Sequence, residues 1–215
     1  MLIYAVADIH GRPERVYAVL AAIARHRPDA LVLAGDAFAG RRPAALQELL
    51  HGLSIPGLAV AGNSDGGLLR QATTRFGNLK PLHLICETVA GVEFVGIDGT
   101  VPVPFHTRLG LREAPLEASA ARLLHRRSIL VVHPPPYGTR DRVLGRFHAG
   151  SRAVGRLVDR CSPALLLCGH IHEQAGVAVR KGTIVVNCAM GGRSQGALIR
   201  YDGRSTPECR MLKRV

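Results

Sequence analysis

Short apolar runs alternate with amphipathic stretches along the first third of the chain. Each run has the length of a strand and is followed at once by glycine or aspartate: residues 2–7, 30–34 and 58–61. After the first run, Val16, Val19 and Ile23 recur at the spacing of a helix that begins near Pro13. Similar stretches predict helices over about residues 43–50 and from residue 68. This alternation indicates parallel strands with helices packed outside them.

The middle of the chain breaks this alternation. Residues 82–88 and 92–97 flank Ala90-Gly91 and predict a hairpin, so the sheet structure is expected to be mixed. Residues 101–115 are rich in proline and glycine and predict a loop. Further strands are expected at residues 128–132, 164–168, 177–179, 183–187 and 197–201, and further helices at 116–126 and 151–159. No linker or repeat divides the chain, so residues 1–215 are expected to form a single domain.

The composition is ordinary for a soluble globular protein. Hydrophobic residues make up 47% and charged residues 20% of the chain, and no apolar run approaches the roughly 20 residues that span a bilayer. The N-terminus lacks the pattern of a signal peptide. The five cysteines are scattered without a C-x-x-C pair, which indicates buried, reduced thiols. We therefore expect a cytoplasmic protein without a membrane partner.

The net charge of +12 raises the question whether the protein binds nucleic acid or a small anionic substrate. Its 28 basic residues are spread along the chain instead of forming one block, which favours a solvated surface over a stripe that binds nucleic acid. Such a surface still attracts an anionic substrate. Nucleic-acid binding is an alternative that this pattern does not favour.

Side chains that commonly bind metal ions follow five of the predicted strands. They are Asp8 with His10, Asp36, Asn63, His133, and His170 with His172. Because the carboxyl ends of strands in an open α/β sheet lie along one edge, we expect these side chains to meet. Three oxygen donors and four imidazoles exceed the needs of one four-coordinate zinc ion and suit two ions that share a carboxylate.

Each of these residues also has an ordinary structural interpretation. Asp8 and Asp36 could cap the helices that follow them, Asn63 could be a turn residue, and His133 could be a hydrogen-bonded core histidine. In an extended turn, the last two histidines would project the same way and converge on one point or on two neighbouring points. The joint occurrence of all these residues at the ends of apolar strands favours a metal site.

Five short motifs occur in order along the chain: Asp8-x-His10, Gly35-Asp36, Gly62-Asn63-x-Asp65, His133 and Gly169-His170-x-His172. This ordered set resembles that of the calcineurin-like metallophosphoesterases. Longer strings, HPPPYGT from His133 and FHAGSRAV from Phe147, are similar to the small prokaryotic Icc-related branch of predicted phosphoesterases. The resemblance covers nearly the whole chain. It implies a four-layer α-β-β-α sandwich of two mixed sheets with outer helices and a dinuclear metal site at the strand C-terminal ends.

The resemblance also divides the expected ligands between two metal ions. It implies that one ion is held by Asp8, His10 and His172. It implies that the other is held by Asn63, His133 and His170, with Asp36 bridging both. This donor set accepts several divalent ions, with manganese preferred and iron, zinc or nickel as alternatives. Two such ions roughly 4 Å apart can clamp a phosphoryl group and activate a bound water as the attacking hydroxide.

One position departs from the family pattern. The third motif commonly has a histidine near the leaving-group oxygen, whereas this chain has Ser64. Serine is too weak an acid to replace it, and loss of a general acid costs about 10²–10⁴-fold in rate. His148 and His106 are alternative proton donors, although either could be an ordinary surface histidine. Asp65, which has no motif histidine to orient, is expected to cap the following helix.

These observations predict a metal-dependent phosphoesterase, with a slight preference for phosphodiesters over phosphomonoesters or other small phosphorylated metabolites. Catalytic roles are assigned to Asp36, Asn63 and His148. The alternatives are a non-catalytic metal-binding scaffold of the same fold and a nuclease, the latter prompted by the basic charge. A scaffold has no need of seven ligands, which argues against the first alternative. The sequence specifies neither the physiological substrate nor the oligomeric state.

Overall fold

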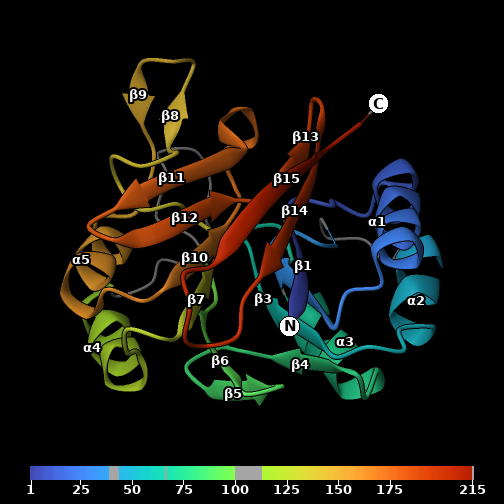
Figure 1. Cartoon of the computed structure of the whole chain (residues 1–215). Helices are drawn as coiled ribbons and strands as arrows, with labels where there is room; N and C mark the ends of the chain where they lie inside the picture. The colour runs from blue at the N-terminus through green and yellow to red at the C-terminus, as the bar shows by residue number, and fades with distance from the viewer. Residues whose placement is uncertain (39–43, 66, 100–112, 215) are drawn as a thin grey trace.

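Two mixed β-sheets lie face to face with helices on both outer sides in the computed structural model (Figure 1). The structure describes residues 1–38, 44–65, 67–99 and 113–214. The arrangement is a four-layer α-β-β-α sandwich, and the predicted fold class is confirmed. Within the described ranges, no helix is both long and apolar enough to cross a membrane.

The first sheet is built around four parallel strands. In spatial order these are β1 (Leu2–Val6), β2 (Ala30–Ala34), β3 (Gly57–Val60) and β4 (Leu79–Pro81). On the other side of β1 lies an antiparallel extension made of β14 (Ser194–Arg200), β13 (Met190–Gly191) and β15 (Glu208–Lys213). The carboxyl ends of β1, β2 and β3 therefore lie at one edge.

The second sheet has parallel central strands and antiparallel edges. In spatial order it contains β11 (Gly176–Arg180), β12 (Thr183–Asn187), β10 (Leu165–Cys168), β7 (Ile129–Val132), β6 (Val92–Ile97) and β5 (Cys86–Val89). β10 runs parallel to both β7 and β12, and β6 runs parallel to β7. The β5–β6 hairpin is confirmed, and its turn residues Ala90 and Gly91 both have positive φ, as a tight hairpin turn requires.

The helices cover the two outer faces, as Figure 1 shows. α1 (Pro13–His26), α2 (Ala44–His51) and α3 (Leu68–Arg75) pack on the first sheet. α4 (Glu113–Leu123) and α5 (Arg152–Cys161) pack on the second. A small hairpin of β8 (Arg142–Val143) and β9 (Phe147–His148) projects beyond the second sheet, and η1 (His172–Gln174) is a short 3₁₀ turn after β10.

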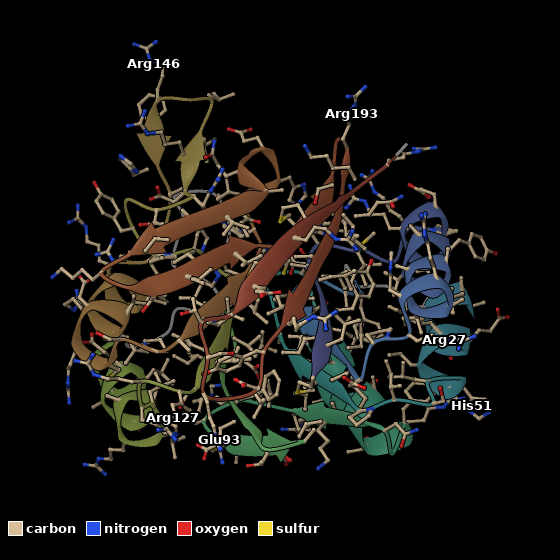
Figure 2. All side chains as sticks on the ribbon, viewed as in Figure 1. Arg27, His51, Glu93, Arg127, Arg146 and Arg193 are labelled. Atoms are coloured by element: carbon tan, nitrogen blue, oxygen red, sulfur yellow. The ribbon has the colours of Figure 1, made fainter. Side chains whose placement is uncertain are left out.

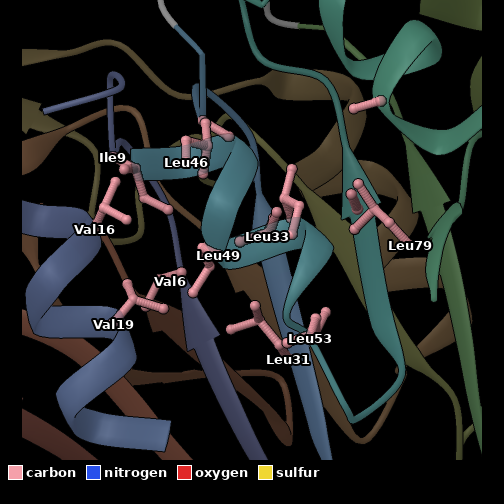
Figure 3. Close-up of a cluster of buried hydrophobic side chains, with 14 of the residues drawn as sticks. Val6, Ile9, Val16, Val19, Leu31, Leu33, Leu46, Leu49, Leu53 and Leu79 are labelled. Carbon is pink, nitrogen blue, oxygen red and sulfur yellow. The ribbon is translucent and has the colours of Figure 1, made fainter. Parts of the chain in front are cut away.

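Side-chain alternation along each strand divides the core into layers. On β1, Ile3 and Ala5 face the second sheet, whereas Tyr4 and Val6 face the helices. Figure 3 shows the helix-side layer, in which Leu31 and Leu33 of β2 lie with the apolar residues of α1 and α2. Each buried Leu or Val of this kind contributes about 1.5–3 kcal/mol, so the core is a stable platform for the strand ends.

Several predicted boundaries were wrong. α4 begins at Glu113 and not at residue 116, because Pro115 in the first turn of a helix loses no hydrogen bond there. The rest of the predicted loop, residues 101–112 with His106, lies outside the described residues.

The short strands β4, β8, β9, β13 and β15 were not predicted. All five cysteines are free as expected, but Cys86 is exposed and not buried.

Candidate metal centre

The seven residues predicted as metal ligands lie together where five strands end. β1, β2 and β3 of the first sheet and β7 and β10 of the second each lead directly into one of these residues or pairs. A backbone hydrogen bond joins the two sheets at this edge, because the Ala7 amide, after β1, donates to the Cys188 carbonyl, after β12, at 3.1 Å. Within the second sheet, the Gly169 amide donates to the His133 carbonyl at 2.9 Å. The strand ends therefore meet in the fold, as predicted.

Asp8, His10 and His172 form the first group of donor atoms. Nε2 of His172 lies 3.0 Å from Oδ1 of Asp8, and Nε2 of His10 lies 3.7 Å from the same oxygen. The two imidazole Nε2 atoms are 3.4 Å apart. The His172 side chain is 42% exposed and that of His10 is 22% exposed, so this group opens toward solvent. Three donors this close to one another could hold one metal ion.

His133 lies at the centre of the second group. Its Nε2 is 3.2 Å from Oδ1 of Asn63, 3.4 Å from Oδ2 of Asp36 and 3.9 Å from Oδ1 of Asp8. The ring of His170 lies edge-on to that of His133, with 5.0 Å between the ring centroids. The atoms of Asp8, Asp36 and His133 are close enough to hold a second ion.

The two carboxylates lie between the two groups. Oδ2 of Asp36 is 3.4 Å from His133 and 3.9 Å from His10, so it reaches both sides, as the bridging role implied by the resemblance requires. Oδ1 of Asp8 has the same intermediate position, with both His172 and His133 within 3.9 Å. A shared position of Asp8 was not predicted, because sequence order does not reveal which carboxylate oxygen points between the groups.

The imidazoles of the His-x-His segment face different partners. His170 lies beside His133, whereas His172 lies beside His10 with a centroid distance of 5.4 Å. Of the two arrangements left open by the sequence, the structure has the one in which they point to two neighbouring positions. The backbone is not the extended turn that was expected, because His170 has a φ of 69° and His172 begins η1.

The backbone at this site is strained. Asp8, His10, Asp36 and His170 all have φ between 52° and 69°, a left-handed conformation that costs a non-glycine residue roughly 1–2 kcal/mol. Hydrogen bonds between the strand-end loops offset this cost. The His10 amide donates to the Asp36 carbonyl at 2.8 Å, and the His170 amide donates to Oδ2 of Asp8 at 2.9 Å. The loops thus hold each other in the conformation that directs these side chains inward.

The prediction that Asp65 caps the following helix was wrong, because this residue has a different role. Its buried carboxylate accepts backbone N–H bonds from Asp36, Phe38 and Gly62, at 2.8, 2.8 and 2.9 Å. Burial is the main cause that raises the pKa of this carboxyl, and the amides act against it. Asp65 therefore fixes the loop after β2 to the loop after β3, and these two loops carry Asp36 and Asn63.

Ser64 contacts Asp36 directly. Its amide donates to Oδ1 of Asp36 at 2.7 Å, and its hydroxyl donates to Oδ2 at 3.0 Å. Burial raises the pKa of Asp36, but the hydrogen bonds from His133 and Ser64 outweigh burial and hold this pKa well below its usual range. Ser64 thus stabilises the ionised carboxylate and is already engaged as a donor.

His133, which is buried, and His170, which is half-buried, have pKa values shifted in opposite directions. Burial lowers the pKa of His133, but its hydrogen bond to Asp36 and the charge of Asp8 outweigh burial and raise this pKa to about 9. For His170, burial and the neighbouring His133 lower the pKa to about 4. The Nδ1 of His133 donates to the Ala34 carbonyl at 3.0 Å, so its Nε2 is the atom that faces the carboxylates.

The residues at this site fit a divalent metal ion. Oδ1 of Asp8 is buried, and although Nε2 of His172 lies 3.0 Å away, no group meets it in hydrogen-bond geometry; it is one of two such side-chain atoms among the described residues. A buried carboxylate oxygen without a donor is costly unless a cation meets it. Burial raises the pKa of Asp8, yet contacts with His172 and His133 lower it overall, so the carboxylate is ionised. Carboxylate, amide and imidazole groups suit several divalent ions.

His148 belongs to a separate cluster on the β8–β9 hairpin. Its Nδ1 lies 2.7 Å from Oδ1 of Asp141, a buried carboxylate that also accepts N–H bonds from Gly138 and Gly150. The imidazole packs against Tyr137 with a centroid distance of 5.1 Å. Within the described part of the chain, no hydrogen bond or ion pair joins His148 to the seven ligand candidates.

Sequence reasoning missed two residues that support this region. Asp141 orients His148, and the only sequence signal was its place between the two longer strings of the resemblance. Arg15 donates from Nη1 to the carbonyl oxygen of Asp8. Its position on α1, five residues after His10, gave no indication of this contact, because the helix had to be placed against β1 first.

The close packing around Gly169 leads to a testable prediction. A Cβ at this position would lie 2.3 Å from Cβ of Ala7 and 2.5 Å from Oδ2 of Asp8. We expect Gly169→Ala to lower the free energy of unfolding by about 1–3 kcal/mol and to weaken Mn²⁺ binding, because the Asp8 carboxylate must move. Thermal unfolding and Mn²⁺ titration would measure both effects.

Gly77→Ala is the matched control, because no atom lies within 4 Å of a Cβ added at Gly77. If both variants bind Mn²⁺ as the wild type does, the close packing at Gly169 has no influence on the Asp8 position.

Comparisons with known proteins give the fold and the family. One crystal structure has a TM-score of 0.78 at 21% identity and covers 99% of both chains. TT1561 of Thermus thermophilus has a TM-score of 0.71 at 16% identity, covering 99% of this chain and 98% of that one. GAP50, the anchor in the inner membrane complex of Plasmodium, has a TM-score of 0.65 at 14% identity, covering 99% and 84%. These identities are low enough that the structures support the fold alone.

Sequence comparison is more specific. A UPF0046 protein of Caenorhabditis elegans is 37% identical over 62 residues, which are 29% of this chain and only 21% of that protein. The family model of the calcineurin-like phosphoesterases matches residues 1–174, which include all seven ligand candidates. The chain therefore belongs to the calcineurin-like phosphoesterase family.

Proposed function

We propose that the protein is a dinuclear metal-dependent phosphoesterase that hydrolyses a phosphodiester or a small phosphorylated metabolite. The observation that carries this proposal is the pair of overlapping donor groups that share Asp8, whose Oδ1 is buried without a donor in hydrogen-bond geometry. Two adjacent donor groups have room for two positive charges. A phosphoryl group, with its negatively charged oxygens, is the substrate that such a pair suits.

The ligands are assigned from the distances and from the family pattern. One ion would be held by Asp8, His10 and His172, the other by Asn63, His133 and His170, with Asp36 between them. Manganese is the preferred ion, with iron, zinc or nickel as alternatives. When bound, the ions would neutralise the phosphoryl oxygens and lower the pKa of a water that attacks phosphorus.

Other residues of the chain would hold the metal donors in place, contact the substrate and supply a proton. Asp65 and Ser64 hold Asp36 and its loop, which keeps the donors in place before substrate arrives. Asn63 is largely exposed, so its amide can contact both an ion and a substrate oxygen. His148, oriented by Asp141, would give a proton to the leaving-group oxygen.

The proposal is tested by metal content and turnover together. After reconstitution with Mn²⁺, elemental analysis should give two ions per chain, and bis(p-nitrophenyl) phosphate should be hydrolysed faster than p-nitrophenyl phosphate. Removal of metal with EDTA should abolish both reactions, and Mn²⁺ should restore them. A protein that holds one ion or none and hydrolyses neither ester would be a scaffold of this fold.

A further inference from the structure

A polar hollow of about 460 Å³ lies between the start of α1 and the β13–β14 turn. Three of its lining residues carry a guanidinium group: Arg12 and Arg15 at the start of α1, and Arg214 after β15. The backbone of Gly191 and Gly192 forms the opposite wall. We refer to this space as the arginine hollow. None of these residues belongs to the seven candidate ligands.

The arginine hollow adjoins the metal centre. A Cβ placed on Gly191 would lie 3.4 Å from Cβ of His172 and 3.9 Å from Nη2 of Arg15, so one backbone segment separates the candidate ligand from the guanidinium. Arg15 also donates to the Asp8 carbonyl. On the other side of the same turn, His172 lines a smaller hollow of about 280 Å³ together with Arg193 and Lys213. The arginine hollow and the candidate ligand His172 therefore lie on the two sides of one backbone segment.

The charges in the arginine hollow are not compensated. Among the described residues that line it, Glu14 alone carries a carboxylate, against three guanidinium groups. Arg12 and Arg214 are exposed, and neither has an ion-pair partner in the described part of the chain. The Arg214 amide donates to the Arg193 carbonyl at 2.7 Å, which holds Arg214 beside the β13–β14 turn. Guanidinium groups bind phosphate oxygens through paired N–H bonds, which makes phosphate the anion that fits.

An aromatic ring completes the lining. Tyr17, one helical turn after Glu14 on α1, is 60% exposed and also lines the hollow. An exposed aromatic face next to arginines can stack on a planar group such as a nucleobase. The combination indicates a ligand that has both a phosphate and a ring.

We propose that the arginine hollow is a subsite for a second phosphoryl group, so that the preferred substrate is a nucleotide-like phosphodiester that also carries a terminal phosphomonoester. The scissile phosphoryl group would lie at the metal centre, and the terminal phosphate would be held by Arg12 and Arg214. This inference rests on the proposed phosphoesterase function, because it assigns the part of the substrate that does not react.

Two esters that differ by a single phosphate test the subsite. Thymidine 5′-(p-nitrophenyl phosphate) lacks the terminal phosphate, and its 3′-phosphorylated form has it. In the wild type we expect a KM roughly tenfold lower for the second ester, the effect of one or two charge-assisted hydrogen bonds. The Arg12→Gln, Arg214→Gln double variant should lose this difference while its kcat on the first ester stays unchanged.

The matched control is Arg70→Gln with Arg127→Gln, which removes the same charge from exposed positions elsewhere. Figure 2 shows Arg127 near α4, at the opposite end of the molecule from Arg193 on the β13–β14 turn. This control should keep the roughly tenfold preference. Equal KM values in the wild type, or a preference that the double variant retains, would overturn the subsite.

A binding measurement separates failure of the subsite from failure of the enzymatic proposal. Titration calorimetry with thymidine 3′,5′-bisphosphate needs no turnover, and the double variant should bind it roughly tenfold more weakly than the control variant does. If neither ester is hydrolysed but this difference in affinity is found, the phosphoesterase proposal fails and the subsite remains. If the esters are hydrolysed and the affinities are equal, the subsite fails and the phosphoesterase proposal remains.

Discussion

Asp36→Asn is expected to lower kcat/KM for bis(p-nitrophenyl) phosphate by at least roughly 10³-fold, because metal-ion catalysis supplies several kcal/mol. The carboxylate of Asp36 lies within 3.9 Å of Nε2 of both His133 and His10, and it receives two hydrogen bonds from Ser64. An asparagine has one acceptor oxygen and no charge. Its amide group would face either the Ser64 donors or the metal position, so the proposed dinuclear site would lose affinity for metal.

Kinetics and elemental analysis of the same preparation measure this prediction. The variant should hold fewer Mn²⁺ ions than the wild type, and excess Mn²⁺ should not restore its rate. Glu208→Gln on β15 is the matched control, because it also removes one carboxylate charge, from an exposed position far along the chain from the candidate ligands. An Asp36→Asn protein with undiminished turnover would remove Asp36 from the bridging position.

The parts of the fold that were predictable from the sequence are those governed by short-range hydrophobic pattern. β2, with five buried apolar residues, and α1, with Pro13 in its first turn, begin where the sequence predicts. β8 and β9 have two residues each, too few for any periodic pattern. β15 is a different case: Cys209 and Met211 pack toward the layer between the sheets, but Leu212 packs on the helix side, so apolar residues do not alternate strictly with polar ones.

The identity of the candidate site was predictable and its geometry was not. Asp8, His133 and the other ligand candidates were recognised because each follows an apolar strand in the order of a family motif. Their grouping depends on hydrogen bonds between loops far apart in the chain, such as that from the His170 amide to Asp8, 162 residues away. The loop-fixing role of Asp65 depends on the same long-range contacts.

His148 offers the second large expected effect. Ser64 is engaged with Asp36, so its hydroxyl is not available as the proton donor that the family motif usually supplies. His148 has the features of a replacement: a partly exposed imidazole, a 2.7 Å contact from Nδ1 to the buried carboxylate of Asp141, and a ring packed on Tyr137. The Asp141 contact fixes Nδ1 and leaves Nε2 as the atom that can meet a leaving group.

His148→Ala should therefore affect substrates according to their leaving group. A dinucleotide such as thymidylyl-(3′→5′)-thymidine has an alkoxide leaving group that needs a proton, and its kcat/KM should fall by about 10²–10⁴-fold. Bis(p-nitrophenyl) phosphate releases a stable phenolate and should be hydrolysed at nearly the wild-type rate. Asp141→Asn should produce a smaller loss of the same kind, because the imidazole remains but is less firmly oriented.

His51→Ala is the control, since His51 lies on α2 on the opposite side of the molecule from the β8–β9 hairpin (Figure 2). The ratio of the two kcat/KM values is the decisive quantity, because a general loss of stability would lower both rates together and leave the ratio unchanged. If His148→Ala hydrolyses the dinucleotide as fast as the wild type, the proton comes from another group. A fall in both rates by the same factor would instead assign His148 and Asp141 to the architecture of the hairpin.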